Sequence, residues 1–238
     1  YMGQDIHYFP MTESTNNDAW KLYEKNFING TVVITDRQYK GRGRHGSDWH
    51  STKNTSLTFS LLFEVNLPPE KLGLLSLLLA VAVNSGITIV TDFRASVKWP
   101  NDILVNKRKL CGILVETRRQ GPKTIVVAGI GLNVNEKKTD FTGDLKVKAT
   151  SIRIETREKV QREVLLARIM YYIEYYVQNI PQVVPQWRFN CMHQNKNILF
   201  YYNNELVEGT FRDIDDNGYA LIDYKGKKIT YTGNRIIL

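Results

Sequence analysis

The order of hydrophobic and polar positions predicts an α+β fold in which helices cover a mixed β-sheet. A first helix is expected after the sequence EST, where Ser14 or Thr15 can cap it. Ala19, Trp20 and Tyr23 then recur at helical spacing. Stretches rich in β-branched residues and joined by short polar turns predict the strands of one sheet. They are HYFP, TVVITDRQ, SLTFSLLF, SVKWPNDILV, KLCGILVETR and KTIVVAGIGLNVN.

A long apolar run, residues 72–90, carries no charged side chain. Its length alone would allow it to cross a membrane. Asn84, Ser85 and Gly86 interrupt the run, so we expect a buried helix before them and a strand with the sequence ITIV, residues 87–90, after them. On this interpretation the run belongs to the core, and we expect no membrane association.

A second helix pattern occupies residues 156–180, and Pro181 ends it. We expect a long amphipathic helix over one face of the sheet. After Trp187 the pattern changes to short alternating strands that are separated by turn signals, which predicts a small all-β module resembling an SH3-like barrel. We therefore expect two domains, residues 1–189 and residues 190–238. The turn signals are Asn203-Asn204, Asn217-Gly218 and Lys225-Gly226.

The composition shows an excess of basic over acidic residues. The 238 residues include 32 Lys+Arg and 24 Asp+Glu, which gives a formal net charge of +8. A cleft lined by basic side chains favours anionic ligands, but a solvated basic surface gives the same net charge. Cys111 and Cys191 show no metal-ligand spacing and suit a reducing compartment. The sequence shows no export signal, so we expect a cytoplasmic protein.

The stretch GRGRHG, residues 41–46, fits the glycine pattern of a dinucleotide-binding turn. That turn requires a helix directly after its last glycine, whereas Gly46 is followed by SDWHS and a predicted strand. The loop must then attract anions through Arg42 and Arg44, whose guanidinium groups suit carboxylate and phosphate oxygens. We expect a mobile cationic lid. A solvated turn, or an RNA-binding arginine-glycine segment, is the alternative.

A second cationic position is Lys98 in the stretch VKWPNDILV. A lysine among apolar strand residues must reach solvent, pair with a carboxylate from a neighbouring strand, or meet an anionic ligand. If Lys98 and the glycine loop flank one pocket, the pocket would suit a ligand with several negative groups. The sequence contains no phosphate-binding G-x-x-x-x-G-K-[ST] loop, no H-E-x-x-H motif and no G-x-S-x-G nucleophile motif.

The ordered motifs ESTN, RQYKGRGRHGSDW, VKWPNDILV, KLCGILVE and GIGLNVN, followed by an SH3-like tail, resemble the biotin protein ligase family. The resemblance runs from about Glu13 to the C-terminus and implies a class II synthetase-like catalytic sheet. It also implies a two-step reaction, in which the biotin carboxylate attacks the α-phosphate of Mg-ATP to give biotinyl-5′-AMP and pyrophosphate. A lysine of a biotin carboxyl carrier domain, part of a biotin-dependent carboxylase, then takes the biotinyl group and releases AMP.

The resemblance implies roles for individual residues. Arg42 and Arg44 would cover the biotin carboxylate and the phosphates, Lys98 would lie where these groups meet, and all three are catalytic candidates. Mg²⁺ would be carried mainly by the ATP phosphates, and no metal ligand in the chain is implied. The implied biotin-binding residues are Ser14, Thr15, Asn16, Gln38, Gly41, Arg42, Gly43, Arg44, Lys98 and Gly112. The implied nucleotide-binding residues are Arg44, Trp49, Lys98, Gly131 and Asn133.

Several expectations stay open beside this resemblance. The winged helix-turn-helix that often precedes the catalytic domain in the family is not found ahead of Glu13, so no DNA binding is expected. Gly233-Asn234-Arg235 stands where the family usually has a Gly-Glu pair, which leaves the role of that acidic residue in doubt. A lipoate protein ligase of the same superfamily is the closest rival function, and an RNA-binding module is a remote one. The protein could be a monomer or a homodimer.

Overall fold

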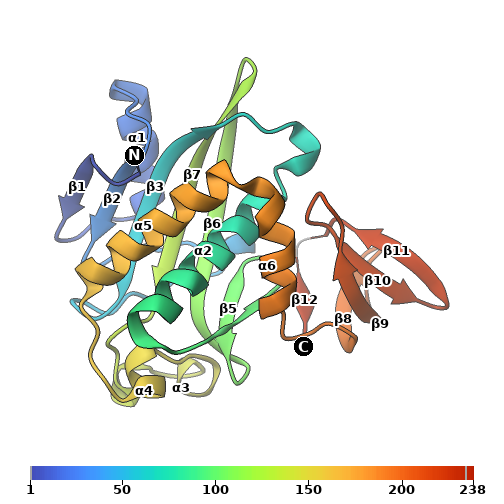
Figure 1. The fold of residues 1–238 in the computed structure, drawn as a ribbon. Coiled ribbons are helices and arrows are strands. Elements are labelled where there is room, and N and C mark those ends of the chain that lie inside the picture. Colours follow the sequence, from blue (N-terminus) through green and yellow to red (C-terminus); the bar gives the residue numbers. More distant parts are fainter. Residues whose placement is uncertain (1, 234) are drawn as a thin grey trace.

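The computed structural model describes residues 2–233 and 235–238, apart from the side chain of His45. A seven-stranded sheet forms the centre, in the order β1-β2-β3-β7-β6-β5-β4 (Figure 1). β1 and β2 are parallel and all other neighbours are antiparallel, so the predicted mixed sheet is confirmed. The strands are β1 (Ile6–Phe9), β2 (Thr31–Thr35), β3 (Leu57–Val65), β4 (Ser96–Lys98), β5 (Asp102–Val105), β6 (Arg108–Gln120) and β7 (Lys123–Leu132).

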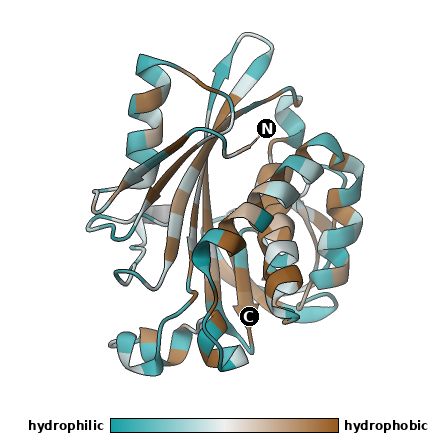
Figure 2. Ribbon diagram, turned by 60° about the vertical axis from the view of Figure 1, so that its left-hand side comes forward, coloured by the Kyte–Doolittle hydropathy of each residue, from teal (hydrophilic) through white to brown (hydrophobic). Residues whose placement is uncertain are grey.

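Helices cover both faces of this sheet. Alternate strand residues point to opposite faces, so Val33, Leu62 and Val127 pack against α1, while Val32 and Val126 join the core formed with α2 and α5. Figure 2 shows the hydrophobic strands between helices on both sides. The helices are α1 (Thr15–Lys25), α2 (Leu74–Thr91), α3 (Leu145–Lys148), α4 (Ile152–Thr156), α5 (Arg162–Gln178) and α6 (Val183–Asn190). Single 3₁₀ turns lie at η1 (Arg44–Gly46), η2 (Pro69–Lys71), η3 (Lys138–Asp140) and η4 (Ile180–Gln182).

The predicted strand at residues 87–90 is wrong, because helix α2 continues through these residues without a break to Thr91. Gly86 does not interrupt it but allows α5 to approach closely: a β-carbon added there would lie 2.7 Å from Cγ1 of Ile169. The Nδ2 group of Asn84 donates to the carbonyl of Ala95. Tertiary packing thus outweighs the β-branched composition of the second half.

The apolar run is a core helix rather than an exposed one. By length and composition the segment Pro69–Thr91 could cross a membrane, but 67% of its most apolar window is buried inside the protein. In Figure 1, α2 lies beside α5 on one face of the sheet, and the two helices pack against each other. The prediction of a buried core helix is therefore confirmed.

The long helix predicted over residues 156–180 is shorter than expected, because α5 begins at Arg162. Arg157 takes a left-handed conformation, with φ 67°, and ends α4. Asn135 then holds Val160 in the following loop, since its side chain accepts from the Val160 N–H at 2.9 Å and donates to the Val160 carbonyl at 2.8 Å. Helix α5 ends at Gln178, before Pro181 as predicted.

A separate five-stranded antiparallel sheet forms the C-terminal module, which confirms the predicted all-β tail. Its strand order is β11-β10-β9-β8-β12. Asn203 and Asn204, like Lys225 and Gly226, have positive φ, as two-residue hairpin turns require. The strands are β8 (Lys196–Tyr202), β9 (Glu205–Ile214), β10 (Ala220–Tyr224), β11 (Lys227–Tyr231) and β12 (Ile236–Ile237).

The C-terminal module packs on the part of the chain that carries the seven-stranded sheet, through aromatic side chains. The indole Nε1 of Trp99, in the turn between β4 and β5, donates to the carbonyl of Gly218 at 2.9 Å. The Trp99 ring also lies 5.7 Å from the ring of Tyr231, between centroids. On α6, Trp187 is buried against Phe211 of β9. Through these contacts the module lies next to the turn that carries the KWPND sequence.

Candidate active site

The glycine loop connects β2 to β3 and folds back on itself. The Gly43 N–H donates to the carbonyl of Ser47 at 2.6 Å, and the Trp49 N–H donates to the carbonyl of Gly41 at 2.8 Å. A β-carbon at Gly43 would lie 2.5 Å from Oγ of Ser47, so a larger residue would force the Ser47 side chain to move. The loop contains only the three-residue turn η1 and leads to strand β3. The predicted absence of a dinucleotide-binding helix after the loop is confirmed.

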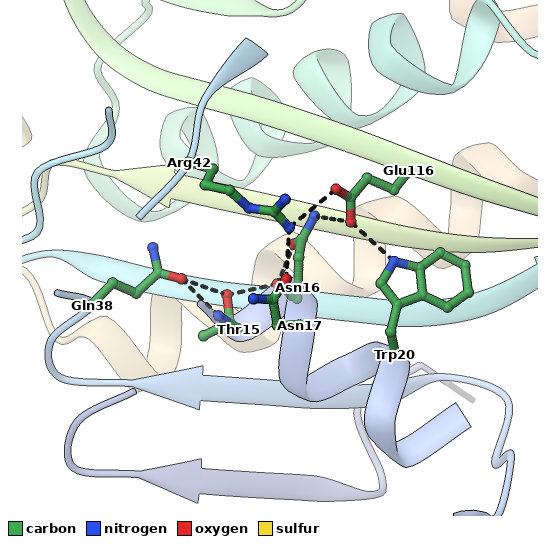
Figure 3. Close-up of polar contacts among 8 residues, drawn as sticks. Thr15, Asn16, Asn17, Trp20, Gln38, Arg42 and Glu116 are labelled. Carbon is green, nitrogen blue, oxygen red and sulfur yellow. Dashed lines mark hydrogen bonds and ion pairs between the residues drawn. The ribbon is translucent and has the colours of Figure 1, made fainter. Parts of the chain in front are cut away.

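Beneath this loop lies a cavity that we call the polar cavity. Its lining includes Ser14, Thr15, Asn16, Gln38, Thr58 and Gly129. The carbonyl oxygen Oε1 of Gln38 accepts hydrogen bonds from the backbone N–H of Thr15 at 2.7 Å and from its hydroxyl at 3.1 Å (Figure 3). The hydroxyl of Thr58 is buried and has no hydrogen-bond partner among the described residues. The cavity therefore presents both donors and acceptors to a neutral polar ligand.

Asn16 is held in one orientation on the floor of this cavity. Its Oδ1 accepts from the hydroxyl of Ser60 at 2.6 Å, and its Nδ2 donates to Oε2 of Glu116 at 3.1 Å. A β-carbon at Gly129 would lie within 2.3 Å of that Oδ1, so only glycine on β7 leaves room for the amide. Helix α1, β3, β6 and β7 together fix the position of this side chain.

Trp49 follows the glycine loop and separates the polar cavity from a second one. Its ring lies over Gly131 of β7 and near Gly112 of β6, which are direct neighbours in the sheet. Its Nε1 is buried and has no hydrogen-bond partner among the described residues. The Nζ of Lys109 lies 6.0 Å from the ring centroid, within the range of a cation–π contact.

The second cavity, which we call the cationic cavity, has a volume of about 560 Å³ against about 50 Å³ for the polar cavity. The larger volume lies in the range of small-molecule sites. Basic side chains from the region of the seven-stranded sheet and from the C-terminal module line it together with Trp49 and Asn133. They are Arg44, Lys98, Lys109, Lys148 and Arg235. Such a concentration of positive charge favours a ligand with several negative groups.

Lys98 ends β4 and faces the cationic cavity. Among the described residues it makes no ion pair within 4.0 Å, because the neighbouring carboxylate of Asp102 pairs instead with Lys109 at 2.7 Å. Burial is the main cause that lowers the pKa of Lys98, and Arg235 and Lys109 lower it further, while Asp102 raises it. The ammonium group is therefore poorly compensated by the protein, as expected for a group that meets an anionic ligand.

Arg44 links the loop to the turn after β4. Its Nη1 donates to Oδ1 of Asn101 at 3.3 Å, and the Asn101 Nδ2 donates to the carbonyl of Ile113 at 2.7 Å. Burial lowers the pKa of the Arg44 guanidinium, and Asp102 partly offsets this effect. Arg44 lines both cavities, so its charge can act on a ligand that spans them.

The structure brings most of the predicted site residues together, although they come from distant parts of the chain. Gly41, the first residue of the loop, is buried and lines neither cavity, whereas Gly131 lines the polar cavity under Trp49. The residues on the polar cavity are Ser14, Thr15, Asn16, Gln38, Arg42, Gly43, Arg44, Trp49, Gly112 and Gly131. Arg44, Trp49, Lys98 and Asn133 line the cationic cavity. Asn234 of the atypical tail lies outside the described residues.

Sequence reasoning missed four residues of the site. Lys109 and Glu116 both belong to the quoted KLCGILVE motif, so their motif was noticed but their side chains were given no role. Asn101 belongs to the quoted VKWPNDILV stretch, but its side chain was given no role. Arg235 gave no usable local signal, because only the packing of the C-terminal module brings it to the cationic cavity.

The described residues contain no group of three His, Cys, Asp or Glu side chains that could hold a metal ion. Asp102 provides a carboxylate in the cationic cavity, but its Oδ1 already pairs with Lys109. This arrangement fits Mg²⁺ bound chiefly by phosphate oxygens and water, which is a common way for proteins to use this ion. Among the described residues there is no dedicated protein cage for a metal ion.

Two sequence-family models match the chain. The model of the biotin/lipoate A/B protein ligase family matches residues 8–133. The model of the biotin protein ligase C-terminal domain matches residues 193–238. The first covers the glycine loop and the motifs VKWPNDILV and KLCGILVE, and the second covers the five-stranded module.

Individual relatives extend the likeness over nearly the whole chain. A bifunctional ligase/repressor BirA of Bacillus spizizenii is 33% identical over 240 residues, which cover 98% of this chain and 74% of the relative. A biotin–[acetyl-CoA-carboxylase] ligase of Mycobacterium tuberculosis is 29% identical over 236 residues, covering 95% and 86%. The biotin protein ligase from Aquifex aeolicus, solved in complex with biotin and ATP, superposes with a TM-score of 0.83 at 26% identity, covering 98% and 97% of the two chains.

Proposed function

This chain belongs to the biotin/lipoate A/B protein ligase family, and we propose on this basis which substrate each of its two cavities binds. The protein is a biotin protein ligase, an enzyme that uses ATP to attach biotin to protein. The match to a biotin protein ligase C-terminal domain favours biotin over lipoate. The observation that carries the proposal is that Arg44 and Trp49 lie where the polar cavity meets the cationic cavity.

The polar cavity would take the ureido ring of biotin. A urea has one carbonyl acceptor and two N–H donors, and the cavity presents hydroxyl and amide groups of both kinds at Ser14, Thr15, Asn16 and Gln38. Ser14, Thr15 and Asn16 lie at the start of α1, and Gln38 follows β2 and accepts a hydrogen bond from the Thr15 N–H. The acyl chain of biotin would then lead its carboxylate toward Arg44.

The cationic cavity would take ATP. Trp49 and Asn133 line it on the side of the catalytic sheet, and the basic residues would face the phosphates. Mg²⁺, arriving with the nucleotide, would supply further charge neutralisation at the phosphate oxygens. No described cluster of acidic residues is needed for this role, since the ion would keep most of its ligands from water and phosphate.

In the first step, a biotin carboxylate oxygen would attack the α-phosphorus of ATP, and the bond to pyrophosphate would break. Two anionic groups must approach each other in this step, so Lys98 and Arg44 would lower the barrier by neutralising the charge between them. The glycine loop would cover the resulting biotinyl-5′-AMP and keep water from its mixed anhydride. In the second step, a lysine amine would attack the acyl carbon and release AMP.

The acceptor would be the carrier domain of a biotin-dependent carboxylase, since relatives are named biotin–[acetyl-CoA-carboxylase] ligases. The two cysteines Cys111 and Cys191 are free, which suits a reducing cytoplasm. We place the catalytic domain at residues 1–189 and the C-terminal domain at residues 190–238, a boundary that falls just before the last residue of α6.

Calorimetry and a pyrophosphate assay test the proposal together. The purified chain should bind biotin and should release pyrophosphate from Mg-ATP only when biotin is present. Lipoate and a single-stranded RNA serve as comparison ligands. Folded protein that binds lipoate or RNA but not biotin would contradict the assignment, as would pyrophosphate release that does not depend on biotin.

A further inference from the structure

Glu116 on β6 joins three parts of the site, although it lines neither the polar nor the cationic cavity. Its Oε2 accepts from Nδ2 of Asn16 at 3.1 Å and from Nε1 of Trp20 at 3.0 Å. Its Oε1 accepts from Nη2 of Arg42 at 3.3 Å. Figure 3 shows the carboxylate between the indole of α1 and the guanidinium of the glycine loop.

The first consequence concerns Asn16. An amide can present its oxygen or its nitrogen to a given neighbour, and a carboxylate accepts only from the nitrogen. Glu116 therefore orients the Asn16 amide with Nδ2 toward the carboxylate and Oδ1 toward Ser60. Without the carboxylate, the amide could turn over and exchange a donor for an acceptor in the polar cavity.

The second consequence concerns the glycine loop. The Nη2 of Arg42 donates both to Glu116 and to Oδ1 of Asn17, the latter at 2.7 Å, so the loop is tied to β6 and to the first turn of α1. The ion pair is exposed enough to be weak, with 49% of the Arg42 side chain and 28% of the Glu116 side chain accessible. A weak ion pair suits the glycine loop if this loop opens for substrate and closes again.

We propose that Glu116 is a positioning residue of the ligase reaction, which couples the orientation of Asn16 to the closed position of the glycine loop through Arg42. The proposal rests on the assignment of the polar cavity to biotin. Glu116 would contact neither biotin nor ATP; it would act through one residue that contacts the ring and through the loop that covers it. Loss of the carboxylate would then weaken both biotin binding and retention of biotinyl-5′-AMP.

Two variants separate these effects. Glu116→Gln keeps the size of the side chain and one acceptor oxygen but removes the charge that holds Arg42, while Glu116→Ala also frees Asn16. We expect the KM for biotin to rise about threefold in Glu116→Gln and at least about tenfold in Glu116→Ala. The kcat at saturating biotin should stay within about twofold, because Lys98 and Arg44, the residues proposed to neutralise charge in the first step, are unchanged in both variants.

A second measurement follows the loop directly. Hydrogen exchange of residues 41–49, in protein without substrates, should be faster in both Glu116 variants, whereas exchange of β3 and β7 should not change. Glu64→Gln is the matched control, because Glu64 lies on β3 and forms an ion pair of similar exposure with Lys123 at 2.6 Å, far from the loop. It should alter neither the KM for biotin nor exchange in the loop.

The outcomes are distinct. An unchanged KM and unchanged loop exchange in Glu116→Gln and Glu116→Ala would overturn the proposal, and so would faster exchange throughout the sheet with a matching fall in kcat. If Glu116→Ala does not fold, the KM for biotin and the loop exchange of Glu116→Gln still test the proposal. If the wild-type protein fails to bind biotin, the assigned function fails, but the exchange measurement still tests whether Glu116 holds the loop.

Discussion

Trp49 occupies the space that any side chain at position 131 would need: a β-carbon on Gly131 would lie 2.1 Å from Cε2 of the indole. The absence of a side chain on β7 therefore allows the aromatic ring to lie directly on the sheet. The ring contributes to the walls of both cavities at this point. The position of the residue that would contact the nucleotide thus depends on a glycine from a distant strand.

Substitution of that glycine should displace the ring. Gly131→Ala is expected to raise the KM for ATP about tenfold, because the added carbon overlaps the indole and forces it to move. Gly112→Ala should have a smaller effect, since its added carbon lies nearest the flexible end of Lys109, 2.9 Å from Cε. Steady-state kinetics with varied ATP measures both. An equal rise in the KM for ATP in the two variants would contradict the special role of Gly131.

Removal of the Lys98 charge should block the first half-reaction. Lys98→Ala is expected to lower biotin-dependent pyrophosphate release about 10²-fold to 10³-fold, the usual effect of losing one group that stabilises transition-state charge. The unfolding curve should change little, because Lys98 makes no ion pair among the described residues. Lys123→Ala, which breaks only the distant pair with Glu64, should keep full activity. Normal release by folded Lys98→Ala would disprove the assignment.

Arg44 should determine how long the intermediate stays bound. Arg44→Ala removes the tie to Asn101 as well as the charge, so we expect slower synthesis and an approximately tenfold shorter half-life of bound biotinyl-5′-AMP. Retention of radiolabelled intermediate during gel filtration measures the half-life. Arg44→Lys should recover part of the synthesis but less of the retention, because an ammonium group lacks the planar fork. An unchanged half-life in Arg44→Ala would exclude a lid function.

The C-terminal module should contribute Arg235 to ATP binding. Deletion of residues 190–238 is a poor test, because it would uncover the buried rings of Trp99 and Trp187. Arg235→Gln removes only the charge and should raise the KM for ATP about threefold to tenfold, with little change in the KM for biotin. Lys225→Gln at an exposed hairpin of the same module is the control. If both variants behave as wild type, the module supports the fold but not nucleotide binding.

His193 should make the protein sensitive to mild acid. Burial lowers its pKa from 6.5 to about 3, with Lys98 and Lys196 adding to the effect, and its ring packs against Trp187 and Phe211. The unfolded chain therefore takes up this proton first as the pH falls below about 6.5, and stability decreases toward acid. Between pH 7.5 and 5.5 the loss from this group is about 1.4 kcal/mol.

Urea titrations at the two pH values measure this effect. His193→Gln cannot take up the proton, so its free energy of unfolding should fall by about 1.4 kcal/mol less than that of the wild type over the same interval. The absolute stability of the variant does not matter for this comparison, because each protein is compared with itself. An equal fall in both proteins would show that His193 does not cause the pH dependence.

Local patterns were sufficient for much of the fold. The strand-like apolar stretches that predicted β6 and β7, the paired asparagines at the β8–β9 turn and the stop at Pro181 all reflect forces between near neighbours in the chain. The same local rules were wrong at residues 87–90, where β-branched side chains favoured a strand but packing of α2 against α5 kept the helix intact.

The sequence by itself determined which residue types were available: a loop with two arginines and three glycines, a lysine on an apolar strand, and an all-β tail. Only the tertiary structure decided how they combine. It pairs Asp102 with Lys109, so that Lys98 faces the cationic cavity without a carboxylate partner among the described residues. It also places Trp49 over Gly131 and joins Asn16 to Arg42 through Glu116. Finally, it brings Arg235 of the C-terminal module to the cationic cavity. These relationships depend on distances between segments far apart in the chain, which no local pattern contains.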